Sequence, residues 1–222
     1  MSLKLSKPIL YLITRGAGDS TTTPETDQFR QILVQVSSAV SAGIQLIQLR
    51  EKQLTTRSLF ELTKRAVELA RGTATKVLVN DRADVARAAL ADGVHLTTQS
   101  LDAVTIRKTF GAEFIIGVST HSLAEAQSAR DGGADFVVFG PVFATASKEK
   151  YGAPLGLKQL AQVAEELSPF PVLALGGVRM DNAATCLRSG ASGIAGITLF
   201  GKREQFFSIV STFNERLRGV VR

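Results

Sequence analysis

The sequence predicts an α/β fold, a single (β/α)8 TIM barrel. Short apolar runs alternate with longer helical patterns along the chain. About eight strands, each followed by a helix, fit a chain of 222 residues, because this architecture starts at roughly 200 residues. Nearly every predicted strand also ends in hydroxyl or ionisable residues or in paired glycines, and in a barrel such groups converge on one face. A doubly wound open sheet, which gathers its site at one switch point, is the alternative.

In the first half of the chain, the predicted strands are short, and the predicted helices carry apolar residues three or four positions apart. Strands are expected over 9–14, 44–49, 76–79 and 93–96, and helices over 29–42, 58–70, 85–89 and 102–109. The Gly/Ser/Thr-rich segment 16–26 is expected to form a loop. Gly43 lies just past the first helix, where a glycine commonly ends one.

The second half repeats the pattern. Strands are expected over 114–118, 136–139, 171–175 and 193–197, and helices over 123–130, 157–167, 180–188 and 205–217. The run at 136–139 is β-branched and aromatic and has glycines on both sides, which favours a buried strand over a helical turn. Because no linker or low-complexity segment interrupts the pattern, residues 1–222 are predicted to form one domain.

The charge of the chain favours small anionic ligands. Lys and Arg number 26 against 20 Asp and Glu, a net charge of +6, and the basic residues are spread along the sequence. A nucleic-acid groove would need a basic stripe with stacking aromatics, but the chain has no Trp and only two Tyr. We therefore expect small-molecule ligands and no nucleic acid.

A single cysteine, Cys186, excludes an internal disulfide and every multi-cysteine metal site. We expect it to fill the core from a helix. No apolar run approaches the ~18 residues of a membrane span, and the N-terminal segment lacks the features of a secretory signal. The sequence thus predicts a cytoplasmic protein without a membrane partner.

Two hydroxyls and an ammonium follow the strand at 136–139. Thr145, Ser147 and Lys148 lie within four residues of one another, a combination suited to holding a phosphate or pyrophosphate. The alternative is a solvated loop.

A second set of donors lies at the exit of the strand at 44–49. Gln48 and Arg50 share one face because side chains in a strand alternate, and Lys52 follows them. Together they could clamp a diphosphate. An Arg-Glu-Lys run after a strand is, however, equally consistent with a solvated turn.

Asn80 and Asp81 follow the strand at 76–79. A carboxylate at that exit can hold Mg²⁺, which commonly binds one or two carboxylates together with substrate phosphates. Alternatively, one of the two residues caps the next helix.

The last two strands suggest a phosphate site. Gly176 and Gly177 follow one strand, and Ile197 and Thr198 end the other. Barrels often bind phosphate with these loops, whose backbone N–H groups point at the anion. The two histidines, His95 and His121, lie near strand ends, and a structural role is favoured more for His95 than for His121.

Taken together, these motifs resemble the thiamine-phosphate synthase/TenI family. The matching stretches occur in family order between about residues 11 and 200, at 48–52, 79–82, 92–96, 117–122, 139–143, 145–148 and 175–178. The resemblance implies a (β/α)8 barrel that joins hydroxymethylpyrimidine diphosphate to hydroxyethylthiazole phosphate. The implied products are thiamine phosphate and pyrophosphate.

The resemblance also implies a role for each matching residue. The pyrimidine diphosphate would be held by Gln48, Arg50, Lys52, Asn80 and Lys148, with Ser119 near its leaving group. The thiazole phosphate would be contacted by Thr145, Ser147, Gly177, Ile197 and Thr198, and Mg²⁺ by Asp81. The family's reaction is dissociative: pyrophosphate leaves, a pyrimidine carbocation forms and the thiazole nitrogen captures it. Such a reaction needs charge neutralisation of the leaving group more than a strong base.

One position departs from the synthase pattern. Where synthases usually carry a second Asp ligand for Mg²⁺, this chain has Ser100, within Thr97-Thr98-Gln99-Ser100. A neutral hydroxyl binds Mg²⁺ less strongly than a carboxylate, although the diphosphate could supply the missing charge. Asp102 lies two residues further on.

The same loss occurs in the TenI branch, whose members are thiazole tautomerases with a histidine at the position of His121 as acid and base. Histidine suits such proton transfer. Because the diphosphate-binding residues are retained, the synthase is favoured. A third hypothesis is that the protein is a regulator that binds thiazole phosphate or thiamine phosphate without turnover. The sequence leaves open whether the chain forms a homo-oligomer and whether the loop at 16–26 closes over the site.

Overall fold

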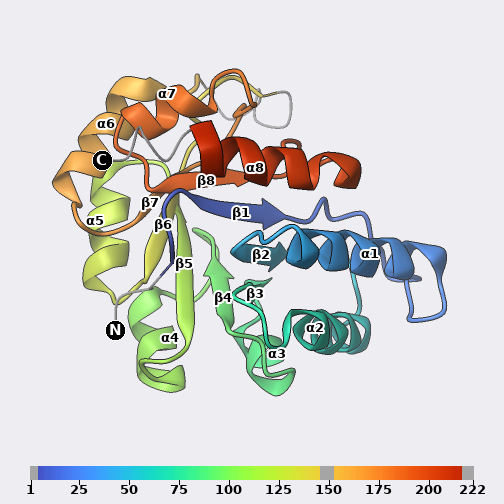
Figure 1. Ribbon diagram of the computed structural model, residues 1–222. Coiled ribbons are helices and arrows are strands. Elements are labelled where there is room, and N and C mark those ends of the chain that lie inside the picture. The colour runs from blue at the N-terminus through green and yellow to red at the C-terminus, as the bar shows by residue number, and fades with distance from the viewer. Residues whose placement is uncertain (1–4, 146–152, 217–222) are drawn as a thin grey trace.

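The computed structural model describes residues 5–145 and 153–216, and it forms a closed barrel of eight parallel strands in the order β1 to β8. β1 pairs in parallel with both β2 and β8, with Tyr11 opposite Leu46 and Ala195. This pairing closes the sheet, so the barrel prediction is confirmed and the open-sheet alternative is wrong. The helices lie outside the strands (Figure 1).

The strands and helices alternate along the chain. The strands are β1 Ile9–Ile13, β2 Leu46–Leu49, β3 Lys76–Asn80, β4 Gly93–Leu96, β5 Ile115–Thr120, β6 Phe136–Phe139, β7 Val172–Ala174 and β8 Gly193–Gly196. The helices are α1 Asp27–Ser41, α2 Thr56–Ala70, α3 Ala83–Ala88, α4 Ala103–Phe110, α5 Leu123–Asp131, α6 Gly156–Glu166, α7 Ala183–Arg188 and α8 Phe206–Arg216, with a 3-10 turn, η2 Arg203–Gln205, before α8. Every predicted element is present.

Helix starts are set by short polar side chains. Thr26, Thr55, Asp102 and Ser122 each accept a hydrogen bond from a backbone N–H in the first turn of the helix that follows. Such caps satisfy donors that have no partner within the helix. The predicted start of α7 was three residues early, because the side chain of Asn182 accepts from Arg179 N at 2.8 Å and holds a turn there instead.

Alternate residues of each strand pack on opposite sides of the barrel wall. Inward-facing side chains fill the interior, and the cluster consists of Ile9, Tyr11, Ile13, Leu46, Leu78, Phe136, Val138, Leu173 and Ala195. Leu10 and Leu12 belong instead to the larger core between strands and helices. The interior is therefore packed with side chains, which leaves ligands to the rim.

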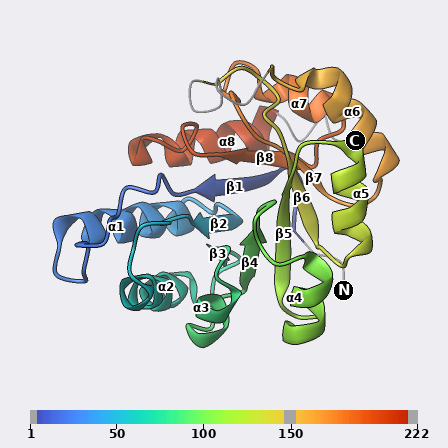
Figure 2. The same ribbon diagram turned by 180° about the vertical axis from the view of Figure 1, so that it is seen from behind.

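The ring of helices has two well-separated sides. In both views α1 and α2 lie side by side, and α5 and α6 lie across the barrel from them (Figures 1 and 2). Within the described ranges, no helix is long and apolar enough to cross a membrane. Cys186 is buried in α7, as expected.

Candidate active site

Polar side chains from adjacent strands form a hydrogen-bonded row at the carboxyl ends of the strands. Gln48, at the end of β2, donates from Nε2 to Asn80 Oδ1 at 3.0 Å. Asn80, at the end of β3, donates from Nδ2 to Asp81 Oδ2 at 2.6 Å. Both amides are buried, so each has a fixed orientation. The structure thus brings together three of the predicted site residues.

Asp81 has an unusual backbone conformation. Its φ is +60°, and Arg82 N donates to Asn80 O across it at 2.8 Å, which makes Asp81 the centre of a tight γ-turn. Aspartate tolerates this region better than most residues. A strained conformation held by its surroundings is typical of functional sites.

Two hydroxyls from the loop after β4 bind the Asp81 carboxylate. Thr97 Oγ1 donates to Oδ1 at 3.1 Å, and Ser100 donates to the same oxygen through a very short bond. The structure therefore places Ser100 beside Asp81, as the sequence predicts. Helix α3 receives no side-chain cap, so the capping alternative for Asn80 and Asp81 is wrong.

The residues around Asp81 fit one kind of magnesium site. A carboxylate with hydroxyl oxygens beside it is the hard-oxygen environment that Mg²⁺ prefers, and one carboxylate suffices where substrate phosphates complete the shell. Among the described residues no group of three or more His, Cys, Asp or Glu could hold a metal. Asp102 is not part of this set, since it caps α4 by accepting from Thr105 N at 2.6 Å.

A cavity of about 270 Å³ adjoins this row, and Lys52, Asn80, Asp81 and Arg82 contribute to its lining. Glu51 also lines the cavity. The described chain thus places Lys52 and Asp81 on the lining of one cavity.

The buried carboxylate of Glu51 holds the loop after β1. Its Oε2 accepts from Gly18 N at 2.8 Å and its Oε1 from Gly16 N at 3.2 Å. Arg50 lies against this loop: a Cβ built on Gly16 would be 3.5 Å from Arg50 Nη1. Thr14 Oγ1 accepts from Arg50 N at 2.8 Å. These contacts position the end of β2, from which Arg50 and Lys52 follow.

His95 and Ser119 form a pair on adjacent strands. His95 Nε2 lies 2.9 Å from Ser119 Oγ. The ring is 2% exposed, and this burial lowers the pKa of His95 to about 4, a shift that the charge of Asp81 opposes. A buried histidine with such a pKa is neutral at physiological pH.

His121, at the end of β5, has one ring nitrogen engaged. Its Nδ1 makes a very short hydrogen bond with the carbonyl oxygen of Gly140. Because a carbonyl can only accept, Nδ1 carries the proton and Nε2 of the neutral ring is the acceptor. This tautomer suits a general base.

The loops after β6 and β7 lie against each other. Val142 N donates to Leu175 O at 2.8 Å and Phe143 N to Gly176 O at 3.0 Å. A Cβ on Gly177 would lie 2.6 Å from Ala144 O, so only glycine fits. The loop that leads to Thr145 thus packs on Gly177.

Ile197 and Thr198 follow β8 directly, and Thr198 is exposed at the rim. Thr198 O accepts from Gly201 N at 3.0 Å, which closes a tight turn. Three described residues that are expected to contact a phosphate therefore follow these last strands: Thr145 follows β6, Gly177 follows β7 and Thr198 follows β8. Ser147 and Lys148 lie outside the described residues.

Sequence reasoning missed Glu51 and Thr97. Glu51 belongs to an Arg-Glu-Lys run that resembles a solvated turn, yet it is 3% exposed. No local signal marked it, because the Gly16 and Gly18 N–H groups that bind its carboxylate lie far away in sequence.

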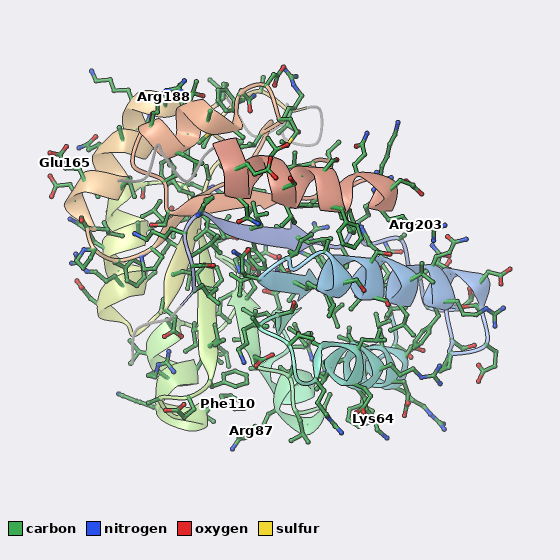
Figure 3. The ribbon with its side chains drawn as sticks, viewed as in Figure 1. Lys64, Arg87, Phe110, Glu165, Arg188 and Arg203 are labelled. Atoms are coloured by element: carbon green, nitrogen blue, oxygen red, sulfur yellow. The ribbon has the colours of Figure 1, made fainter. Side chains whose placement is uncertain are left out.

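The charged side chains on the outer helices point away from the barrel on several sides. Figure 3 shows Lys64, Arg87 and Arg188 projecting from separate parts of the helical ring.

Comparisons with known proteins show relatives along most of the chain. The family model described as thiamine monophosphate synthase matches residues 20–200. A thiamine-phosphate synthase of Roseiflexus sp. (strain RS-1) is 39% identical over 192 residues, covering 86% of this chain and 77% of that protein. One from Chlorobium phaeobacteroides is 39% identical over 181 residues, covering 82% and 87%.

A solved structure agrees with these matches. Thiamine phosphate pyrophosphorylase from Pyrococcus furiosus superposes with a TM-score of 0.78 at 32% identity, covering 96% of this chain and 97% of that one. The family model and both synthases match most of the length of this chain. This chain belongs to the thiamine monophosphate synthase family.

Proposed function

We propose that the protein condenses hydroxymethylpyrimidine diphosphate with hydroxyethylthiazole phosphate to form thiamine phosphate and pyrophosphate. The observation that carries this proposal is the row Gln48, Asn80 and Asp81, fixed by hydrogen bonds beside a cavity that Lys52 also lines. Amide donors, a cation and a metal-binding carboxylate are what a bound diphosphate requires. Membership of the thiamine monophosphate synthase family supports the same substrates.

In this reaction the bond between the pyrimidine methylene carbon and the diphosphate oxygen breaks first. The electron pair leaves with pyrophosphate, and the methylene carbon becomes cationic. The lone pair of the thiazole nitrogen then forms the new C–N bond. The protein's task is to stabilise the charge that grows on the departing diphosphate.

Arg50 and Lys52 would supply positive charge at the exit of β2, and Lys148, which lies outside the described residues, would be a third cation as the family resemblance implies. The rigid amides of Gln48 and Asn80 orient the substrate, since each is held by a neighbour. Asp81, with Ser100 beside it, would hold Mg²⁺. When bound, the ion supplies Lewis-acid stabilisation of the phosphate oxygens.

The second phosphate belongs to the thiazole substrate. Backbone N–H groups at Gly177 and after β8, with the Thr198 hydroxyl, suit a phosphate monoester. Thr145, and Ser147 outside the described residues, would also contact this phosphate, as the family resemblance implies. A separate anion site for each substrate fits the two-substrate reaction.

A second candidate is a thiazole tautomerase. The observation that favours it is the tautomer of His121, whose Nδ1 bonds to Gly140 O and leaves Nε2 as a base. The row formed with Asp81 has no role in moving a proton between two positions of a thiazole. We therefore place the synthase first.

One assay separates the candidates. Purified protein is incubated with Mg²⁺ and both substrates, and thiamine phosphate and pyrophosphate are quantified. The synthase predicts one pyrophosphate per thiamine phosphate, and Asp81→Asn should lower the rate at least about 100-fold. Isomerisation of the thiazole phosphate carboxylate without condensation would instead indicate the tautomerase. Binding of thiazole phosphate without turnover would indicate a regulator.

We also propose that residues 1–222 form one domain and that the enzyme works in the cytoplasm. The free, buried thiol of Cys186 is compatible with that reducing compartment. Mass measurement in solution would show whether the chain forms a homo-oligomer.

A further inference from the structure

His95 lies inside the barrel among rings. Its ring centroid is 5.6 Å from that of Tyr11 and 6.1 Å from that of Phe136. On its remaining side is Gly117, where a Cβ would lie 2.8 Å from His95 Nδ1. The imidazole ring is therefore held in one position, and a side chain larger than glycine at residue 117 would collide with it.

The two nitrogens of this ring have different environments. Nε2 lies 2.9 Å from Ser119 Oγ. Nδ1 is buried and has no hydrogen-bonding partner among the described residues. A neutral imidazole carries one proton. The position of that proton decides whether Nδ1 is a buried donor or a buried acceptor without a partner.

The position of the proton follows from that cost. If Ser119 donated to Nε2, the proton would sit on Nδ1 as a buried N–H without an acceptor, which is among the rarest arrangements in proteins. If Nε2 carries the proton and donates to Ser119 Oγ, an acceptor lone pair on Nδ1 is left without a partner, and buried acceptors lack a partner more often than buried N–H donors do. The second arrangement costs less. A doubly protonated ring would donate from Nε2 as well, so the direction does not depend on the charge of His95.

This direction determines what Ser119 can offer a ligand. A hydroxyl has one hydrogen and two lone pairs. When Nε2–H occupies one lone pair, the hydrogen is free to point out of the interior toward the rim. An anionic oxygen at the rim accepts that hydrogen, whereas the reverse arrangement would present only lone pairs to it.

We propose that His95 is a positioning residue that keeps the Ser119 hydroxyl available as a donor to the departing diphosphate. The proposal rests on the proposed condensation, because it assigns a direction to one hydrogen bond in that reaction. His95 does not touch the substrate; it acts through Ser119.

A spectroscopic test does not depend on activity. The chain has only two histidines, so ¹⁵N–¹H correlation spectra of the imidazoles contain two ring systems, and His121→Asn assigns them. We expect the Nε2–H form for His95 at neutral pH and the Nδ1–H form for His121. An Nδ1–H form for His95 would mean that Ser119 donates inward, and it would overturn the proposal.

A double-mutant cycle tests the consequence for the reaction. Ser119→Ala and His95→Leu should each lower kcat by about 10- to 100-fold, the value of one hydrogen bond to a charged group. The double variant should be no slower than Ser119→Ala alone, because the histidine then has nothing to orient. Multiplicative losses would contradict the proposal, since they indicate an independent structural effect.

Two amide variants of His95 distinguish the loss of its hydrogen bond from a disturbance of the fold. The amide of His95→Gln reaches Ser119 and can donate, whereas that of His95→Asn is too short. Gln should therefore restore kcat to within about threefold of wild type, and Asn should resemble the loss in Leu, at matched thermal stability. Equal rates for Gln and Asn would overturn the proposal. An inactive wild-type protein with the expected tautomers would instead refute the proposed function.

Discussion

The hydroxyl of Ser100 donates a hydrogen bond to the carboxylate of Asp81, from the loop after β4 to the end of β3. The carboxylate therefore already has a neutral partner where synthases usually have a second acidic ligand. Since the substrate diphosphate carries its own charge, one carboxylate can suffice for Mg²⁺ at this site.

Ser100→Asp should strengthen metal binding. Two carboxylates would repel each other in the metal-free protein and bind the ion together. We expect Mg²⁺ affinity in the presence of pyrophosphate to rise about tenfold by titration calorimetry, and Mg²⁺ to raise the melting temperature more than in wild type. Ser100→Ala is the matched control, which should not gain affinity. An unchanged affinity in Ser100→Asp would show that Asp81 is not a ligand.

Glu51→Gln should release the loop after β1. The amide keeps one acceptor oxygen but turns an NH₂ group toward a backbone N–H, which costs about 1–3 kcal/mol locally. Amide exchange at Gly16 and Gly18 should accelerate at least about tenfold, and KM for the diphosphate substrate should rise. The exposed Glu68, which pairs with Arg71, gives the control Glu68→Gln. Unaltered exchange at both glycines would contradict this role.

Arg107→Ala should lower the free energy of unfolding without changing the active site. Its guanidinium lies 2.7 Å from Asp135 and also donates to the carbonyl oxygens of Gly111, Phe114 and Gly133. Removing it leaves a largely buried carboxylate unpaired, so we expect a loss of about 3 kcal/mol in urea unfolding. Activity at low temperature should persist.

The control for Arg107 is Arg130→Ala. Arg130 pairs with Asp131 on the surface, and exposed pairs contribute less than about 1 kcal/mol. Equal losses in the two variants would show that burial of the Arg107 pair is unimportant.

Gly177→Ala should damage the expected phosphate site. Gly177 and Gly43 both have positive φ, +65° and +78°, but a Cβ meets nothing within 4 Å at Gly43 and lies 2.7 Å from Phe143 Cβ at Gly177. Gly43→Ala should therefore show only the conformational cost, about 1 kcal/mol. Gly177→Ala should cost more and should raise KM for the thiazole phosphate. Equal effects would mean that the close packing on Gly177 does not matter.

Cys186 should make stability fall in alkaline solution. Burial raises the pKa of its thiol from about 9 to about 11, so the native protein keeps a proton that the unfolded chain loses. The stability difference between wild type and Cys186→Ala should fall by about 2 kcal/mol from pH 8 to pH 11. It should be constant below pH 8. A constant difference across the whole range would contradict the burial effect.

Much of the fold could be predicted because local patterns and topology agree. The strand β4 has the predicted bounds, since its apolar residues stand between polar ends. Asn80, Asp81 and Ser100 could be proposed as neighbours because they lie at or after the ends of β3 and β4, which pair with each other. The γ-turn at Asp81 and the burial of Glu51 could not be found, because both depend on contacts with residues far away in sequence. The roles of all the predicted site residues stay predictions, and Ser147 and Lys148 also lie outside the described residues.

We propose that donors, cations and one carboxylate from separate strands bind the departing diphosphate at one rim of the barrel. A crystal structure with pyrophosphate and Mg²⁺ would show whether they do. We expect the anion beside Arg50, Lys52 and Ser119, with the ion on Asp81. Pyrophosphate bound away from Asp81, or no ion at its carboxylate, would show that the diphosphate is not bound in this way.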